Sequence, residues 1–297
     1  MGGGAPSREI VGSVWDRQSV WSQTANRLKA RIDRLRSAML ALAVASALLT
    51  TLAAQVESLT EPLGKTLAVL AGVAVGLVPV VRSRLGRDAV SRWTRARAVS
   101  EELKAEVFQY LADVAPYRGG DAGEQLLART RTVEDEAADL LVDTADIEAV
   151  QRGAPAVHDV ATYVEHRVDP QIRWYRGRSA GLKRRLARAR VAELGLGVLG
   201  VLLAAVAAAG ELDALAAWVA VVTTLAAALS SHVAASRWEY QLVEYLRTAA
   251  ELGRLRDEWS VAGALDEAAE DRFVERCEHV VSIQNDGWMA KWAADLS

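Results

Sequence analysis

The fold is decided by two apolar runs, AMLALAVASALLTTLAAQV at residues 38–56 and KTLAVLAGVAVGLVPVV at residues 65–81. The first run carries no charge, and the second is charged only at Lys65. Each is about as long as the roughly 17–25 residues that a helix needs to cross a bilayer. The polar segment between them is long enough only for a turn, so we expect a transmembrane helical hairpin.

A second pair of apolar runs, at residues 191–209 and 212–230, repeats this arrangement. Apolar helices of this length also occur at the centre of soluble bundles. However, four such runs, paired by tight turns and flanked by arginine, are difficult to enclose in one soluble core. The composition also favours helix, since 51% of the residues are hydrophobic and only 6 are proline. We therefore expect an all-α membrane protein.

The two halves of the chain share an order of features that indicates duplication. LKRRLARAR at residues 182–190 matches LKARIDRLR at residues 28–36 in most basic and apolar positions, and Ser-Arg-Trp follows both hairpins. Gly-Ala-Pro at 153–155 offers no helical continuation. We expect two tandem repeats, each a transmembrane hairpin with long cytoplasmic helices. The predicted divisions are a flexible tail at 1–13, repeat 1 at 14–152 and repeat 2 at 153–297.

Helices are also expected outside the apolar runs. Apolar residues at helical spacing predict an amphipathic helix over residues 14–36 that runs into the first span. A stripe with Trp93 and Leu103 predicts a helix after the first hairpin, and Leu242, Leu246, Ala249 and Leu252 predict its counterpart after the second. Residues 121–150 are predicted to form one acidic helix, with its charges facing solvent.

The distribution of basic residues predicts the orientation in the membrane. Arginine and lysine gather before spans one and three and after span two, whereas carboxylates lie in both hairpin turns. The positive-inside rule then places both termini in the cytoplasm of a multi-pass protein of the cell inner (plasma) membrane. The basic cluster expected at the membrane face contains Arg31, Arg34, Arg36, Arg82, Arg84, Arg185, Arg188 and Arg190.

This plan resembles the SLATT superfamily, the SMODS- and SLOG-associating two-transmembrane effector domains, and in particular its domain-of-unknown-function branch. The residues that carry the resemblance are QIRWY at 171–175, LKRRLARAR at 182–190, PYRG at 116–119 and the closing helix at 280–292. The resemblance implies a membrane pore that harms the host cell when an associated sensor detects infection. It covers nearly the whole chain, as a tandem duplication.

Several other classes of function are disfavoured. A net charge of −3 provides no uniform basic field for nucleic acid. The four histidines are scattered, no Cys/His cluster has metal-ligand spacing, and neither a phosphate-binding glycine loop nor a nucleophile elbow occurs. We expect no enzyme activity, no cofactor and no metal. Cys277, the sole cysteine, cannot form an internal disulfide and is expected to be a small buried residue.

Two functional hypotheses remain open. The first is an oligomeric ion channel or pore, a membrane-perturbing effector of a bacterial conflict or defence system. The second is a non-conducting anchor whose cytoplasmic helical bundle scaffolds a partner. Because anchoring alone does not need two hairpins, the sequence favours the pore. The expected partners are the lipid bilayer, other copies of the chain and a cytoplasmic sensor protein, with no nucleic acid.

Candidate residues follow from the small and polar positions of the spans. Rings of carboxylates and hydroxyls suit a cation pathway, whereas small residues at spacings of four also mark helix packing. Both interpretations stay open for the predicted pore-lining set: Ser46, Thr50, Glu57, Gly200 and Glu211. The predicted helix-packing set consists of Gly72, Gly76 and Gly195, with Trp93 and Trp238 near the membrane face.

Overall fold

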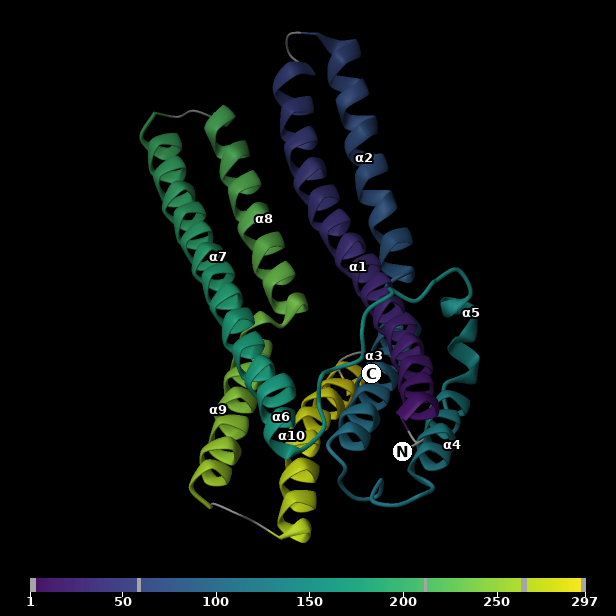
Figure 1. The fold of residues 1–297 in the computed structure, drawn as a ribbon. Coiled ribbons are helices and arrows are strands. Elements are labelled where there is room, and N and C mark those ends of the chain that lie inside the picture. The colour runs from purple at the N-terminus through teal and green to yellow at the C-terminus, as the bar shows by residue number, and fades with distance from the viewer. Residues whose placement is uncertain (1–3, 58–59, 211–212, 263–265, 295–297) are drawn as a thin grey trace. The chain divides into compact units, whose positions relative to one another are not determined.

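The computed structural model is built from helices throughout the residues that it describes (Figure 1). It describes the backbone of residues 4–57, 60–210, 213–262 and 266–294, and the side chains of residues 8–57, 60–86, 88–210, 215–262 and 266–282. In those parts of the chain no strand occurs. The long helices are α1 (Gly4–Glu57), α2 (Glu61–Ser83), α3 (Arg87–Leu111), α7 (Asp169–Gly210), α8 (Asp213–Ser236), α9 (Trp238–Ala262) and α10 (Glu267–Ala294).

Four helices are long and apolar enough to cross a membrane, which confirms the all-α membrane fold with two repeated halves. The apolar windows lie in α1, α2, α7 and the helical stretch that begins at Leu215, with mean hydropathies of 1.9, 1.9, 2.2 and 1.6. Figure 1 shows α1 with α2, and α7 with α8, as antiparallel pairs, as expected for two hairpins. In the first hairpin, Pro62 at the start of α2 suits the first helical turn, where its missing N–H leaves no bond unmade.

The chain divides into two compact units that do not follow the sequence halves. One, here called the core unit, contains Met1–Ala30, Arg87–Ser179 and Val243–Ser297. The other, here called the span unit, contains Arg31–Gly86 and Ala180–Leu242. Each unit therefore takes residues from both halves, so neither half forms a compact unit by itself.

A hydrophobic core shared by the two halves holds the core unit together. Val14, Phe108 and Leu126 come from the first half, and Tyr163 and Leu252 come from the second. The ring of Phe108 meets that of Tyr163 edge-on, with their centroids 6.2 Å apart. Helix α3 packs against both α4 (Ala122–Asp135) and α10, so it joins a helix of the first half to the last helix of the second.

Two predicted segments differ from the structure. Helix α1 begins at Gly4, so residues expected in a flexible tail are helical, and Val11 is buried in the core. The single acidic helix expected over 121–150 is wrong. Helix α4 ends at Asp135 and is followed by a 3-10 turn, Ala138–Leu140, and by α5 (Leu141–Thr144). Arg95 explains the break, because its guanidinium donates to the backbone oxygen of Glu136 (3.0 Å) and so satisfies that carbonyl outside a helix.

The segment from residue 145 to the start of α6 (Val160–Tyr163) has no helix, yet it is tied down at both ends. Its N-terminal part binds α1, where Gln23 donates to the backbone oxygen of Glu148 (2.7 Å). At its other end Asp159 forms a capping box with Thr162, which accounts for the helix beginning at Val160. Five residues of π-helix, Val164–Val168, then lead into α7.

Candidate functional site

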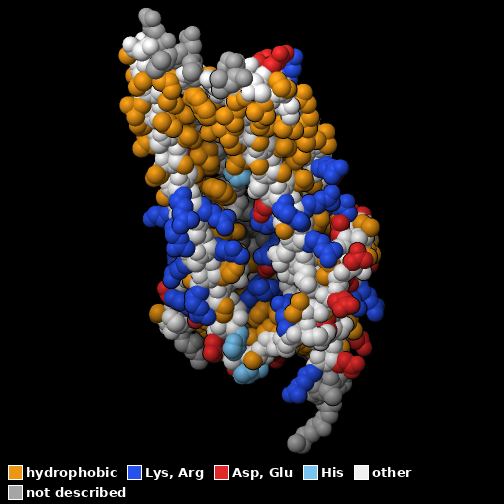
Figure 2. All heavy atoms as spheres, turned by 90° about the horizontal axis from the view of Figure 1, so that it is seen from above, with side chains coloured by type: hydrophobic (Ala, Val, Ile, Leu, Met, Phe, Trp, Pro, Cys, Tyr) orange, Lys and Arg blue, Asp and Glu red, His pale blue; other side chains and the backbone are white. Residues whose placement is uncertain are grey.

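The span unit presents an apolar outer surface, and its mainly apolar interior contains a few buried hydroxyl side chains. Val69, Val191 and Val201 are 66%, 70% and 70% exposed, as side chains that face lipid would be. Figure 2 shows hydrophobic side chains covering these helices on the face in view. By contrast, the hydroxyl residues Ser46 and Thr51 are buried, each with 8% exposure. The polar side chains inside the span unit are therefore the part of it that could meet a hydrated path.

The predicted pore-lining residues do not share one environment. Ser46 is buried, whereas Thr50 and Glu57 are exposed. Gly200 is buried beside Val222, and a Cβ added there would lie 3.6 Å from that side chain. Glu211 lies outside the described residues. The carboxylate of Glu57 is thus available at the end of α1, while the hydroxyl below it at Thr50 faces away from the interior.

The predicted packing glycines are not at contacts between the described helices. A Cβ added at Gly72, Gly76 or Gly195 would meet nothing within 4 Å. In α2 the buried positions are instead Gly64, Ala71 and Ala74. A Cβ at Gly64 would lie 2.7 Å from the Cα of Glu57, so it is this glycine that permits close approach of α1 and α2.

The two tryptophans predicted near the membrane face differ in burial. Trp93 is buried in the core unit, and the ammonium of Lys29 lies 5.0 Å from its ring centroid. Trp238 is half-buried and its ring lies 5.9 Å from that of His232. Between α8 and α9, Arg237 has a positive φ of 51°, a left-handed conformation that ends one helix before the next begins.

Most of the predicted basic cluster is exposed, as headgroup-facing arginines would be. Arg36 alone is intermediate, and Arg190 pairs with Glu239 at the surface. The other members are exposed: Arg31, Arg34, Arg82, Arg84, Arg185 and Arg188. Figure 2 shows Lys and Arg side chains gathered beside the apolar surface, in agreement with the charge asymmetry read from the sequence.

A buried ionic cluster in the core unit was not predicted from the sequence. Arg167, in the π-helical turn, binds Glu278 of α10 in a bidentate manner, with N–O distances of 2.9 and 2.7 Å. The Tyr163 hydroxyl donates to the same carboxylate at 2.8 Å, and the guanidinium lies over the Phe108 ring. Arg167 and Glu278 are 3% and 6% exposed. No local pattern marks a pair that is 111 residues apart in the chain.

The cluster extends to the first half through α3. Glu101 pairs with Arg97 at 2.8 Å, and its other oxygen lies 3.9 Å from Nη1 of Arg167. Neither this second oxygen of Glu101 nor Nη1 of Arg167 has a hydrogen-bond partner among the described residues. Burial raises the pKa of Glu101, but Lys104, Arg97 and Arg167 outweigh burial and hold it at about 2. Burial lowers the pKa of Lys104 to about 8. Glu101 is therefore ionised at neutral pH.

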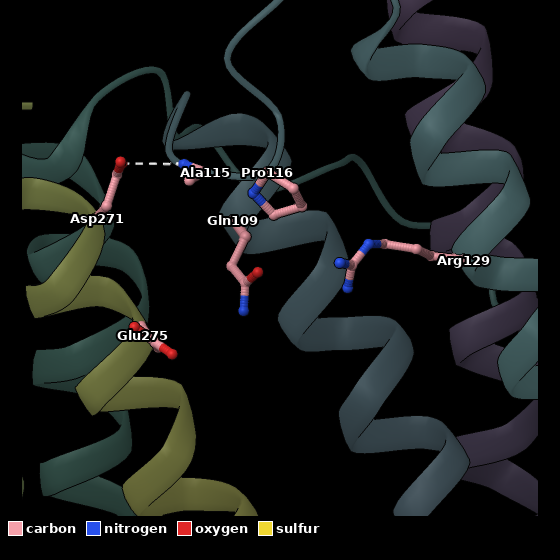
Figure 3. Close-up of a pocket in the computed structure, with 6 residues that line it drawn as sticks. All are labelled: Gln109, Ala115, Pro116, Arg129, Asp271 and Glu275. Atoms are coloured by element: carbon pink, nitrogen blue, oxygen red, sulfur yellow. Dashed lines mark hydrogen bonds between the residues drawn. The ribbon is translucent and has the colours of Figure 1, made fainter. Parts of the chain in front are cut away.

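A second feature of the core unit is a polar pocket of about 380 Å³, lined by Gln109, Ala115, Pro116, Arg129, Asp271 and Glu275 (Figure 3). Asp271 already accepts from the N–H of Ala115 (2.9 Å) and from Arg118 (3.0 Å). Arg129 donates to Glu106 (3.1 Å). Because Asp271 and Arg129 are already paired within the chain, these two charged groups are not free to bind a ligand. Among the described residues, no group of His, Cys, Asp or Glu is arranged to hold a metal ion.

Comparison with known families assigns each half separately. Residues 163–288 match the model of SMODS and SLOG-associating 2TM effector domain 1 (SLATT_1). Residues 19–125 match that of a protein of unknown function, DUF4231. No match was found among curated proteins or among solved structures. Each match contains one hairpin and the helix that follows it, in line with the predicted resemblance. The chain is thus a membrane protein whose first half is similar to DUF4231 and whose second half is similar to the SLATT two-transmembrane effector domain.

Proposed function

We propose that the chain is a homo-oligomeric channel or pore of the inner membrane, a membrane-perturbing effector with both termini in the cytoplasm. The observation that carries this proposal is the second complete hairpin. One hairpin suffices for anchoring, yet both halves provide spans, and two hydroxyl side chains of the first span, Ser46 and Thr51, are buried within the span unit. The description of the matched family as an effector domain supports the same function.

The proposal requires several copies of the chain, because the buried residues of the spans are mainly small and let the helices of one copy pack closely. Ala71, Ala74 and Gly64 bring α1 and α2 close together and leave no room for ions between them. Gly72, Gly76 and Gly195 have open space beside them, which another copy could approach closely. A conduit would then run between copies, controlled by a cytoplasmic sensor protein that acts on the core unit.

A scaffold is the second candidate, and the shared core favours it. The core unit combines both halves around one hydrophobic cluster and is larger than an anchor alone requires. In that case the four spans hold the bundle at the membrane and carry no current. The two candidates differ in a single property, namely whether the assembled protein conducts.

The selectivity of the current tests where ions pass. We expect the double variant Glu57→Gln with Glu211→Gln to lower the preference for cations over anions, because rings of carboxylates attract cations. The measurement is the reversal potential of the full chain in planar bilayers between asymmetric salt solutions. Glu61→Gln is the matched control, since Glu61 is exposed at the start of α2 but already pairs with Lys65 at 2.5 Å. An unchanged reversal potential in the double variant would exclude the outer carboxylates from the path.

A further inference from the structure

Two opposite edges of the core unit carry complementary charges. Between residues 134 and 150 the chain has seven carboxylates and no Lys or Arg, and between 173 and 178 it has three cations, Arg173, Arg176 and Arg178, and no carboxylate. Three of the carboxylates pair with arginines of α1 and α3. The other four are exposed: Asp135, Glu136, Asp146 and Glu148. All three cations of the second stretch are exposed as well.

Each edge also exposes apolar side chains. On α5, Leu141 and Val142 are 53% and 70% exposed, and we call these two residues and the four carboxylates the acidic edge. On α9, Val243 and Leu246 are 61% and 50% exposed. With Arg173 and Arg176 of α7 they form what we call the basic edge. Helices α7 and α9 are neighbours there, because the rings of Trp174 and Tyr245 meet with their centroids 5.5 Å apart.

The two edges cannot meet within one copy. Helix α3 packs against α4 and α10, and α10 in turn contacts α9 through the stacked rings of Trp259 and Phe273, 4.5 Å apart. The helices are thus arranged in the order α4, α3, α10 and α9, and Figure 1 shows α4 and α5 on one side of this group and α9 on the other. Contact between the edges requires two copies, arranged head to tail.

The internal repeat indicates that the basic edge lacks a neighbour. Counted from Ser91 and Ser236, which begin the matching Ser-Arg-Trp motifs, Glu101 of α3 corresponds to Leu246 of α9. Glu101 is buried by residues of the following half, whereas Leu246 is half exposed. In a head-to-tail assembly, the first half of another copy, which carries the acidic edge, would take the corresponding place beside α9.

We propose that the basic edge of one copy binds the acidic edge of the next, so that the copies form a head-to-tail ring through their core units. The two edges are complementary in charge and in hydrophobicity, since in this contact cations face carboxylates and Val243 and Leu246 face Leu141 and Val142. A contact between two different edges generates a closed ring when its rotation closes. This inference rests on the proposed homo-oligomer and specifies the surfaces that build it.

Charge reversal in the full chain tests this contact. Chains with Asp146→Lys and Glu148→Lys, or with Arg173→Glu and Arg176→Glu, should each assemble at about tenfold higher concentration than the unchanged chain, because like charges then meet. An equimolar mixture of the two should regain assembly, since every contact again joins opposite charges. The measurement is native mass in detergent micelles. Arg272→Glu with Arg276→Glu, two exposed positions on α10, makes the same charge change and should have no effect.

The outcomes separate this contact from the function on which it rests. If the unchanged chain is a monomer at all concentrations, the proposed oligomer itself fails. If it assembles but neither reversal weakens assembly, the edges are not the interface and this inference alone is overturned. If Arg173→Glu with Arg176→Glu weakens assembly only when anionic lipid is present, and the mixture does not restore it, these arginines bind headgroups and the inference is also overturned.

Cross-linking supplies a test that does not depend on charge. Chains with Val142→Cys and chains with Leu246→Cys, carrying different tags, should cross-link to each other when mixed in micelles. Neither should cross-link to itself, because the proposed contact joins different edges. Cys277 is 1% exposed and should contribute little background. Self-cross-linking of Leu246→Cys in place of the mixed product would show a symmetric contact and contradict the head-to-tail arrangement.

Discussion

Replacing Glu278 with alanine is expected to destabilise the core unit by about 3–5 kcal/mol, because Arg167 would remain buried without its partner. The expected loss is a large share of the roughly 5–15 kcal/mol that stabilises a typical folded domain. Arg167 is 3% exposed and makes both of its short contacts to this carboxylate. Tyr163 would lose its acceptor in the same variant. The measurement is chemical unfolding of the full chain in detergent, followed by circular dichroism.

A double variant distinguishes loss of the pair from loss of packing. Arg167→Leu with Glu278→Leu removes both charges together and should recover most of the stability, since buried ion pairs are often replaceable by apolar residues. Glu239→Ala is the matched control, because Glu239 pairs with Arg190 at the surface, where ion pairs contribute about 1 kcal/mol or less. If Glu278→Ala costs no more than Glu239→Ala, the cluster does not hold the halves together.

Gly64→Ala is expected to destabilise the first hairpin by about 1–3 kcal/mol through overpacking. The new Cβ would lie 2.7 Å from the Cα of Glu57, so the ends of α1 and α2 would have to separate. Gly72→Ala is the control, because a Cβ there meets nothing within 4 Å. Since alanine favours helix over glycine by about 1 kcal/mol, this control should be neutral or stabilising. The midpoint temperature of thermal unfolding in detergent should be lower for Gly64→Ala than for Gly72→Ala. Equal midpoints would mean that α1 and α2 do not approach each other at Gly64.

The sequence predicts the spans because long uncharged windows are rare outside membranes, but it does not predict which face of each span packs. Helix α2 is apolar on all sides, so no amphipathic pattern marks its buried face. The Gly72 and Gly76 motif lies outside the packed face within one copy, where Ala71 and Ala74 are buried instead, and its predicted use between copies stays a prediction. A glycine motif allows a second helix to approach closely, but whether such a contact forms depends on the neighbouring helix.

The core unit illustrates a second limit, which is contact across the sequence. The division at residues 152 and 153 follows composition, but the compact units combine both halves. Arg167 lies among residues that read as an ordinary helix start, and Glu101 reads as one of many surface charges on α3. Their burial depends on α10, which is more than 100 residues away from either. Local pattern thus identifies helices and membrane segments, whereas charge burial arises only from tertiary packing.

The current through planar bilayers that contain the purified full chain tests most directly whether the assembled chain conducts. We expect discrete, stepwise currents from the unchanged chain. At the same protein concentration these currents should be much reduced in the variant with Arg173→Glu and Arg176→Glu, and they should return in its mixture with the variant carrying Asp146→Lys and Glu148→Lys. The control with Arg272→Glu and Arg276→Glu should conduct as the unchanged chain does. An assembled, correctly folded chain that carries no current under any applied voltage would contradict the pore and leave the membrane scaffold.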